Sequence, residues 1–219
     1  MSYGLGNLMT DTDSVVYIID DDPGVCAALS RLFRSVGLRA EVFTSANDFM
    51  RKKLHPVASC IVLDVRLPGL GGFEFHAELR KARIYIPIVF VTGHGDVPMS
   101  VRAMKAGAVD FLTKPFRDQE MLDAVTAAIA TDRTRLDVQS AREGIQTLFD
   151  SLTPREREVM GMVAAGFMNK QIAAQLSLSE QTVKIHRGNM IRKMNAKSLA
   201  DLIRMAEALG FSAQNPVEP

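Results

Sequence analysis

Hydrophobic and polar positions along the first 125 residues follow two alternating patterns. Short apolar runs rich in β-branched residues predict five strands, at Val15–Ile19, Glu41–Phe43, Cys60–Leu63, Ile88–Val91 and Val109–Leu112. Apolar residues at helical spacing predict five helices between and after them, at Val25–Val36, Ala46–Lys53, Phe73–Lys81, Met99–Ala106 and Asp118–Ile129. This alternation predicts an α/β doubly wound fold, a five-stranded parallel sheet with helices on both faces.

The pattern changes after residue 130. Residues 131–150 are mostly polar, with apolar positions too sparse for a coiled coil, and we read them as a semi-rigid helical linker with Gly144 as its weak point. Four further helices and no strand are predicted beyond it, at Pro154–Ala165, Asn169–Leu176, Glu180–Met194 and Leu199–Leu209. The predicted organisation is a tail at 1–13, an α/β domain at 14–130, the linker at 131–150, an all-α domain at 151–211 and a second tail at 212–219.

Composition and cysteine usage narrow the class of protein. The chain has 219 residues, 47% hydrophobic and 23% charged, as in an ordinary globular protein. No apolar window is long enough for a membrane span, and residues 1–13 lack the pattern of a signal peptide. Cys26 and Cys60 have no metal-binding or redox spacing, so we expect small buried side chains. A cytoplasmic location without membrane attachment fits these features.

Charge is distributed unevenly although the net charge is only +1. Residues 151–219 hold nine Lys and Arg against six Asp and Glu, and the stretch from Gln181 to Lys197 contains no acid at all. A basic stretch of this kind is typical of a nucleic-acid-binding face, although it can also be a solvated helix face. The C-terminal helices are therefore candidates for contact with DNA.

Polar side chains gather at the predicted carboxyl ends of the strands. Asp20–Asp22 follows the first strand, Asp64 the third and Thr92 the fourth, and Lys114 comes shortly after the fifth. Ligands of doubly wound sheets bind at this edge. Carboxylate oxygens suit Mg²⁺, which leaves room for phosphate oxygens. We therefore expect Mg²⁺ beside Asp64, where the ion and Lys114 neutralise a phosphoryl group passing to the Asp64 carboxylate and Thr92 donates a hydrogen bond to it.

Ordinary roles exist for individual members of this set. Asp22 precedes Pro23 and a helix, so it can be an N-cap with proline at the first helical position. A single aspartate at a strand end is often just solvated. Arg66 and His94 lie two residues after Asp64 and Thr92, and they either control the access of water to the phosphoryl group or are simply exposed loop side chains.

At these residues the chain resembles a known family. Residues 14 to about 125 look like a response-regulator receiver domain of two-component signalling. The motifs that carry the resemblance are Asp20-Asp21, Leu63-Asp64-Val65-Arg66-Leu67-Pro68-Gly69, Val91-Thr92-Gly93 and Lys114-Pro115.

The resemblance implies a role for each matched residue. Asp64 would be the phosphoacceptor, and the Mg²⁺ ligands would be Asp21 and Asp64, with Asp20 assisting and the backbone carbonyl of Arg66 as a third protein ligand. Lys114 would contact the phosphoryl group, and Thr92 and Phe111 would form the switch pair. The bond between Lys114 and Pro115 is often cis in this family. The phosphodonor would be a sensor histidine kinase.

The third of the C-terminal helices has two distinct faces. Val183, Met190 and Met194 share one face, which we expect to lie in the core. The opposite face presents a cationic and polar set that suits the DNA major groove, namely Lys184, Ile185, Gly188 and Arg192. Before these helices, Thr153, Pro154 and Glu156 have the spacing of a capping box.

Residues about 148–210 resemble a LuxR-type helix-turn-helix domain. The matching stretches are Leu152-Thr153-Pro154-Arg155-Glu156, Asn169-Lys170-Gln171-Ile172-Ala173, Thr182-Val183-Lys184-Ile185-His186-Arg187 and Ser198-Leu199-Ala200-Asp201-Leu202. Together with the receiver, they match the NarL/FixJ group of transcription regulators. The implied DNA-binding residues are Lys170, Thr182, Lys184, Ile185, Arg187, Gly188 and Arg192. Some relatives carry lysine in place of Gly188, and in this family the fourth helix commonly pairs DNA-bound domains.

These observations lead to one hypothesis with two alternatives. The chain is read as a phosphorylation-dependent transcription regulator that binds operator DNA as a homodimer and catalyses no reaction beyond its own phosphorylation and dephosphorylation. Phosphorylation would promote receiver pairing or release the DNA-binding domain, and the sequence leaves both routes open. One alternative is a phosphorylation-independent DNA-binding protein whose receiver is only an interaction module. The other is a metal-dependent aspartyl phosphatase, which the attached basic helices disfavour.

Overall fold

The computed structural model describes residues 14–211, so both predicted tails lie outside the described residues. The chain divides after Leu136 into two compact units. Within the described part of the chain, the first unit comprises residues 14–136 and the second unit residues 137–211.

The first unit is built on a five-stranded parallel sheet. The strands are β1 (Val15–Ile19), β2 (Arg39–Phe43), β3 (Ser59–Asp64), β4 (Ile88–Thr92) and β5 (Asp110–Thr113), in the spatial order β2-β1-β3-β4-β5. All four pairings are parallel, and β1 is fully buried between β2 and β3. The predicted α/β doubly wound fold is confirmed. The order of strands reverses between β1 and β3, which places a switch point there.

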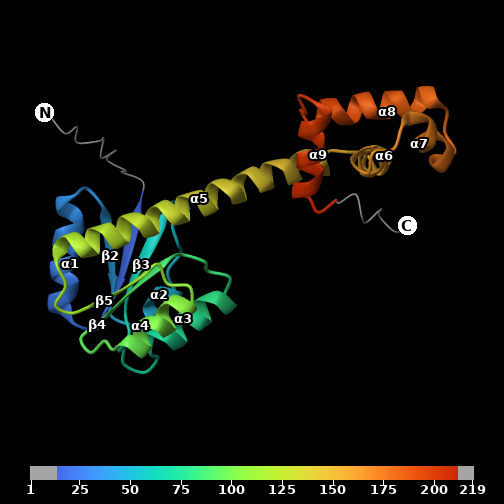
Figure 1. Cartoon of the computed structure of the whole chain (residues 1–219). Coiled ribbons are helices and arrows are strands. Elements are labelled where there is room, and N and C mark those ends of the chain that lie inside the picture. Colours follow the sequence, from blue (N-terminus) through green and yellow to red (C-terminus); the bar gives the residue numbers. More distant parts are fainter. Residues whose placement is uncertain (1–13, 212–219) are drawn as a thin grey trace, which may run out of the picture. The chain divides into compact units, whose positions relative to one another are not determined.

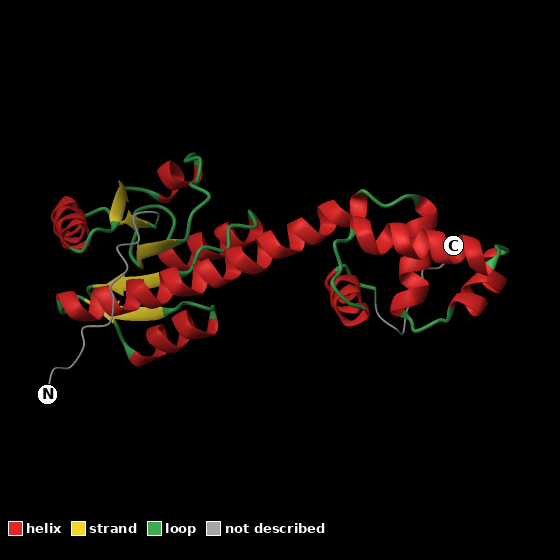
Figure 2. Ribbon diagram, turned by 90° about the horizontal axis from the view of Figure 1, so that it is seen from above, coloured by secondary structure: helices red, strands yellow, loops and turns green. Residues whose placement is uncertain are grey.

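Helices cover both faces of the sheet (Figures 1 and 2). They are α1 (Pro23–Ser35), α2 (Ala46–Met50), α3 (Gly72–Lys81), α4 (Val97–Lys105) and α5 (Asp118–Asp150). Alternate residues of β1 supply the two cores: Val16 and Ile18 pack with α1 and α5, whereas Tyr17 and its neighbours of the same parity pack with α2, α3 and α4. This alternation follows from the period of two residues along a strand.

Some element boundaries differ from the predicted ones, for local reasons. The apolar pattern placed the start of α1 two residues too late, whereas the N-cap predicted at Asp22 is confirmed. Its carboxylate accepts hydrogen bonds from the backbone N–H groups of Gly24 and Val25, and Pro23 is the first helical residue. Strand β2 also begins two residues earlier, since Arg39 pairs with Val15 of the buried strand β1 although its own side chain is exposed. The periodicity of apolar residues predicts neither the helix cap nor the pairing of an exposed strand residue.

The second unit is helical. It contains the end of α5, which runs unbroken through Gly144, and then α6 (Pro154–Ala164), α7 (Asn169–Leu176), α8 (Glu180–Lys193) and α9 (Leu199–Ala208). The predicted capping box at the start of α6 is confirmed, with Thr153 and Glu156 bonded reciprocally. The core includes Leu152, Val159, Met160, Ile172, Val183, Met190, Met194 and Leu202. The last turn of α5 joins this core through Phe149, whose ring lies 5.3 Å from that of Phe211.

Candidate phosphoryl-transfer site and nucleic-acid interface

The carboxylates predicted from the sequence meet at the switch point of the sheet. Asp20 follows β1 and Asp64 ends the neighbouring strand β3, so the register that pairs Ile19 with Leu63 brings the two aspartates to the same edge. Both are buried, with exposed fractions of 3% and 8%, whereas Asp21 is exposed. Parallel strands place their carboxyl ends together, which explains why residues 44 positions apart share one site.

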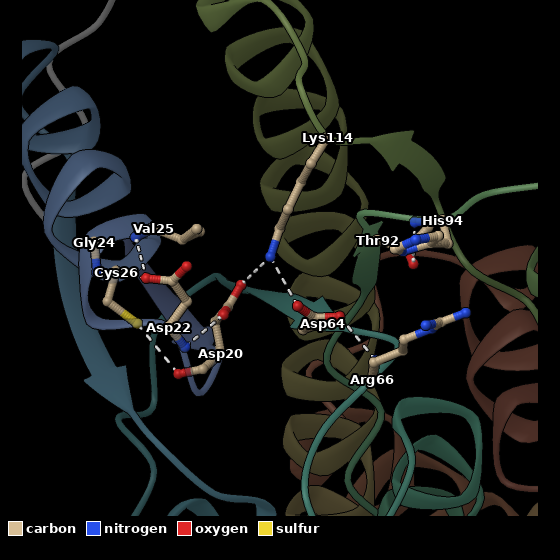
Figure 3. A network of polar contacts seen from close by, with 10 residues as sticks. All are labelled: Asp20, Asp22, Gly24, Val25, Cys26, Asp64, Arg66, Thr92, His94 and Lys114. Carbon is tan, nitrogen blue, oxygen red and sulfur yellow. Dashed lines mark hydrogen bonds and ion pairs between the residues drawn. The ribbon is translucent and has the colours of Figure 1, made fainter.

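Lys114 bridges the two buried aspartates (Figure 3). Its Nζ donates to Asp20 Oδ2 at 2.6 Å and to Asp64 Oδ2 at 2.7 Å. Burial disfavours the charged ammonium, but the two carboxylates outweigh that cost and raise the pKa of Lys114. Burial also raises the pKa of Asp20, which the hydrogen bonds from Lys114 and from the backbone of Asp22 offset only in part. The peptide bond between Lys114 and Pro115 is cis.

The donor set fits a hard divalent cation. Asp20, Asp21 and Asp64 each offer a carboxylate oxygen, and these oxygens lie within 4.8 Å of one another. Three carboxylates beside one lysine leave a formal charge of about −2 when all are ionised, which an ion such as Mg²⁺ would balance. The backbone N–H of Arg66 donates a hydrogen bond to Asp64 Oδ1 at 2.8 Å, whereas the Arg66 side chain is exposed.

The predicted switch pair lies on β4 and β5. Thr92 is fully buried, and its hydroxyl oxygen accepts a hydrogen bond from the backbone N–H of His94 at 3.3 Å. Phe111 is half-buried and packs against the core that underlies α3 and α4. Gly95 brings the β4–α4 loop against both side chains, because an added Cβ there would lie 3.3 Å from Thr92 Cγ2, 3.1 Å from Phe111 Cε1 and only 2.3 Å from Thr113 Cγ2.

The sequence did not predict one close contact beside Asp64. Helix α3 begins at Gly72, where an added Cβ would lie 2.5 Å from the backbone oxygen of Asp64. Only a residue without a side chain lets the first turn of α3 approach the phosphoacceptor candidate so closely. The pair Gly71-Gly72 was visible in the sequence, but a glycine pair by itself signals a turn rather than a contact.

Helix α8 shows the two predicted faces. Val183, Met190 and Met194 are completely buried, and Ser179 caps the helix by accepting from the backbone N–H of Thr182. The four residues of the proposed DNA-facing side are all exposed: Lys184, Ile185, Gly188 and Arg192. Ile185 keeps 55% of its surface exposed, which is unusual for an isoleucine.

The other predicted DNA-binding residues lie in different environments. Lys170 is exposed on α7. The hydroxyl of Thr182, half-buried at the start of α8, lies 2.8 Å from the hydroxyl of Ser179. Arg187 is half-buried, and its NH1 donates to Asn169 Oδ1 at 3.1 Å, which ties α8 to α7. Arg187 therefore also holds the two helices of the helix-turn-helix motif together.

The sequence did not predict the half-buried ion pair between α6 and α8. Lys193 Nζ donates to Glu156 Oε2 at 2.7 Å, and the same carboxylate oxygen accepts from the backbone N–H of Thr153 at 2.8 Å. Glu156 is only 3% exposed. The capping-box spacing identified Glu156 as a cap, but no local signal indicates a partner 37 residues away.

Comparisons with known proteins agree with this architecture. The family described as "Response regulator receiver domain" matches residues 16–126, and the family described as "Bacterial regulatory proteins, luxR family" matches residues 150–206. The chain belongs to the response regulators with a LuxR-type DNA-binding domain. It is 54% identical to nodulation protein W of Bradyrhizobium diazoefficiens over 96% of this chain and 92% of that protein.

Two further relatives match this chain over nearly their whole length. The transcriptional regulatory protein FixJ of Bradyrhizobium diazoefficiens is 38% identical over 91% of this chain and 98% of that protein. The structure of the response regulator StyR matches with a TM-score of 0.80 and 43% identity, covering 89% of this chain and 98% of that one. The chain is thus a two-component transcription regulator, and its family implies a histidine kinase and DNA as partners. No helix within residues 14–211 is both long and apolar enough to cross a membrane.

Proposed function

We propose that Asp64 accepts a phosphoryl group from a sensor histidine kinase and that this modification controls operator binding by the C-terminal helices. The observation that supports the proposal most strongly is the Lys114 ammonium, which lies within 2.7 Å of carboxylate oxygens from both Asp20 and Asp64. A half-buried lysine beside a nucleophilic carboxylate is suited to neutralise the charge of a transferring phosphoryl group.

In the transfer, the bond between phosphorus and the histidine nitrogen of the kinase breaks, and a bond forms between phosphorus and a carboxylate oxygen of Asp64. The Arg66 backbone N–H holds the carboxylate in place through Oδ1, and Lys114 contacts Oδ2. Asp20, Asp21, Asp64 and the backbone carbonyl of Arg66 would hold Mg²⁺, which supplies positive charge to the phosphoryl oxygens when bound. Attack by water on phosphorus later restores the Asp64 carboxylate and releases phosphate.

Phosphorylation then biases the switch residues. The Thr92 hydroxyl, now bonded to the His94 backbone N–H, would turn to a phosphoryl oxygen, and Phe111 would move further into the core. The proposed domain limits are those predicted from the sequence: receiver 14–130, linker 131–150 and DNA-binding domain 151–211. The outcome is a homodimer on a two-fold operator, acting in the cytoplasm, with no catalysis beyond the chain's own phosphorylation and dephosphorylation.

For DNA contact, we propose that α8 enters the major groove. The exposed residues Lys184 and Arg192 reach phosphates or guanine edges, and Ile185 meets a thymine methyl. Lys170, Thr182 and Arg187 contact the DNA backbone beside the groove. The NH1 group of Arg187 already donates to Asn169 Oδ1, so the rest of its guanidinium makes the DNA contact. Gly188 has open space around its missing Cβ and lets the helix approach the DNA closely.

The test of the phosphoryl step is intact-mass analysis of the full chain. The protein is incubated with Mg²⁺ and acetyl phosphate, beside an Asp64→Asn variant and beside a sample with excess chelator. The proposal predicts one phosphoryl adduct on the wild-type chain that needs Mg²⁺ and is absent from the variant. An adduct of equal yield on Asp64→Asn would refute Asp64 as the acceptor.

A further inference from the structure

The feature that carries a further inference is a buried carboxylate far from the phosphoryl-transfer site. Among the described residues of the first unit, the buried aspartates are Asp20, Asp64 and Asp132. The first two belong to the proposed site. Asp132 lies on α5, within the segment read from the sequence as a polar linker, and is only 1% exposed. A buried carboxylate is costly unless it is paired, so its partners indicate what it does.

Asp132 binds the first residue of the central strand β3. Its Oδ2 accepts a hydrogen bond from the backbone N–H of Ser59 at 2.8 Å, and its Oδ1 accepts from Arg135 Nε at 2.8 Å. Ser59 is itself 1% exposed, so its N–H depends on a protein acceptor. The Arg135 side chain, one helical turn further on, is 34% exposed and balances the charge of the carboxylate. We call this arrangement of Asp132, Ser59 and Arg135 the Asp132 anchor.

The strand held by this anchor is the one that ends at Asp64. Strand β3 runs from Ser59 to Asp64, so the Asp132 anchor holds one end of the strand and the proposed phosphoacceptor occupies the other. Six strand residues span roughly 20 Å at about 3.3 Å each. Phosphorylation at the carboxyl end of β3 would therefore act on the same strand to which α5 is fastened.

Beyond the anchor, α5 loses its contacts with the receiver core. Leu136 is the last residue of α5 that packs against the core of the first unit. The eight residues from Asp137 to Gly144 are all exposed, and the next half-buried positions of α5 belong to the core of the second unit. The course of the helix where it leaves the sheet is thus set by the contacts of Ile129, Asp132 and Leu136.

We propose that Asp132 is a positioning residue that couples the state of Asp64 to the linker helix. Asp132 holds the part of α5 that leaves the receiver core against the first residue of β3. A change at the phosphorylation site is thereby transmitted to residues 137–150. Removing the Asp132 anchor should leave phosphorylation of Asp64 unchanged, because Asp132 does not contact that site. It should abolish the effect of phosphorylation on DNA binding. The inference rests on the proposed function for its coupling part.

The experiment compares four full-length proteins. They are the wild type, Asp132→Ala, Asp132→Asn and the control Asp137→Asn, which removes an exposed carboxylate five residues further along the same helix. The asparagine at 132 keeps an acceptor for Ser59 but loses the ion pair with Arg135. Three quantities are measured: the rate of adduct formation with acetyl phosphate, amide hydrogen exchange of residues 132–144, and the affinity for a DNA duplex selected from a random library with phosphorylated wild-type protein.

The expected result is a separation of these quantities. All four proteins form the adduct at the wild-type rate. Exchange in residues 132–144 accelerates roughly tenfold or more in Asp132→Ala, less in Asp132→Asn and not in the control. The ratio of DNA affinities with and without phosphorylation falls from about fivefold or more in the wild type to about 1 in Asp132→Ala.

Other outcomes overturn the inference. A wild-type affinity ratio in both Asp132 variants would refute the coupling role. Loss of adduct formation in step with a lower melting temperature would show that Asp132 supports the whole receiver rather than the linker. If the wild type itself gains no DNA affinity on phosphorylation, the proposed function fails, and unchanged hydrogen exchange in both Asp132 variants would then refute the anchor independently.

Discussion

Replacing Glu156 by alanine tests how the recognition helix is held. The Glu156 side chain is 4% exposed and joins two structural features: the cap of α6, through the Thr153 backbone N–H, and helix α8, through Lys193. Alanine at this position removes both contacts at once. The substitution should therefore destabilise the second unit without touching the receiver.

The size of the effect follows from the two contacts. Removing one partner of a buried ion pair costs about 3–5 kcal/mol when the other charge stays buried. Lys193 keeps 34% of its side chain exposed and can turn toward water, which lowers this part to about 1–2 kcal/mol. Loss of the capping contact adds about 1 kcal/mol. We expect a loss of about 2–3 kcal/mol in the free energy of unfolding of the second unit.

Hydrogen exchange is the suitable assay because intrinsic fluorescence cannot follow this unit. The chain has no tryptophan, and its three tyrosines, Tyr3, Tyr17 and Tyr85, all precede residue 136. A loss of 2–3 kcal/mol should accelerate the slowest amides of α6 and α8 by about 30- to 150-fold, with no change in β1 or β3. Glu158→Ala is the matched control, since Glu158 lies on the same helix in an exposed pair with Arg155 worth under about 1 kcal/mol.

The pH dependence of the stability of the second unit tests the same contacts independently. Burial disfavours ionised Glu156, but the hydrogen bonds from Lys193 and Thr153 outweigh it and lower the pKa of this carboxyl. A lowered folded-state pKa means that the stabilisation is complete above the unfolded pKa and is lost as pH falls through the folded one, beginning below about pH 5. Glu156→Gln should flatten this decline. Equal exchange rates in the Glu156→Ala and Glu158→Ala variants would refute the reasoning.

Three further predictions concern the two sites. Lys114→Met should slow adduct formation with acetyl phosphate by about 100-fold, because it removes the cation between Asp20 and Asp64; a wild-type rate by intact mass would exclude a catalytic role. Replacing Arg66 and His94, both exposed, by alanine should speed loss of the phosphoryl group, and an unchanged dephosphorylation rate would remove the idea that they restrict water. Gly188→Ala should stabilise α8 by up to about 1 kcal/mol. It should nevertheless weaken DNA binding in an anisotropy titration, because the added methyl group fills the open space through which the helix approaches the DNA. An unchanged affinity would show that the helix backbone does not approach the DNA closely at this position.

Local patterns in the sequence predict those parts of the structure that depend on local periodicity. The alternation of strands and helices predicted the doubly wound sheet, since each apolar run must be buried on both faces. The position of Asp20, Asp64 and Thr92 directly after apolar runs predicted that they lie at one edge, because parallel strands end together. On α8, helical spacing separated Val183 and Met190 in the core from the exposed basic face.

Contacts between distant residues could not be predicted in this way. Asp132 was read as part of a polar linker, yet it lies buried against Ser59, 73 residues earlier in the chain. Lys193 lies within the basic stretch from Gln181 to Lys197, yet its ammonium pairs with a buried carboxylate on α6. In both cases the polar residue type indicates solvent exposure, and only the tertiary structure supplies the partner that makes burial favourable.

The measurement that tests the central claim most directly is DNA affinity of the full chain before and after phosphorylation. The probe is a duplex selected from a random library with the phosphorylated protein, titrated at fixed salt with the wild type and with Asp64→Asn. The account predicts that acetyl phosphate with Mg²⁺ raises the affinity of the wild type by about fivefold or more and leaves the variant unchanged. Equal affinities before and after complete phosphorylation of the wild type would contradict it and favour a DNA-binding protein whose receiver is only an interaction module.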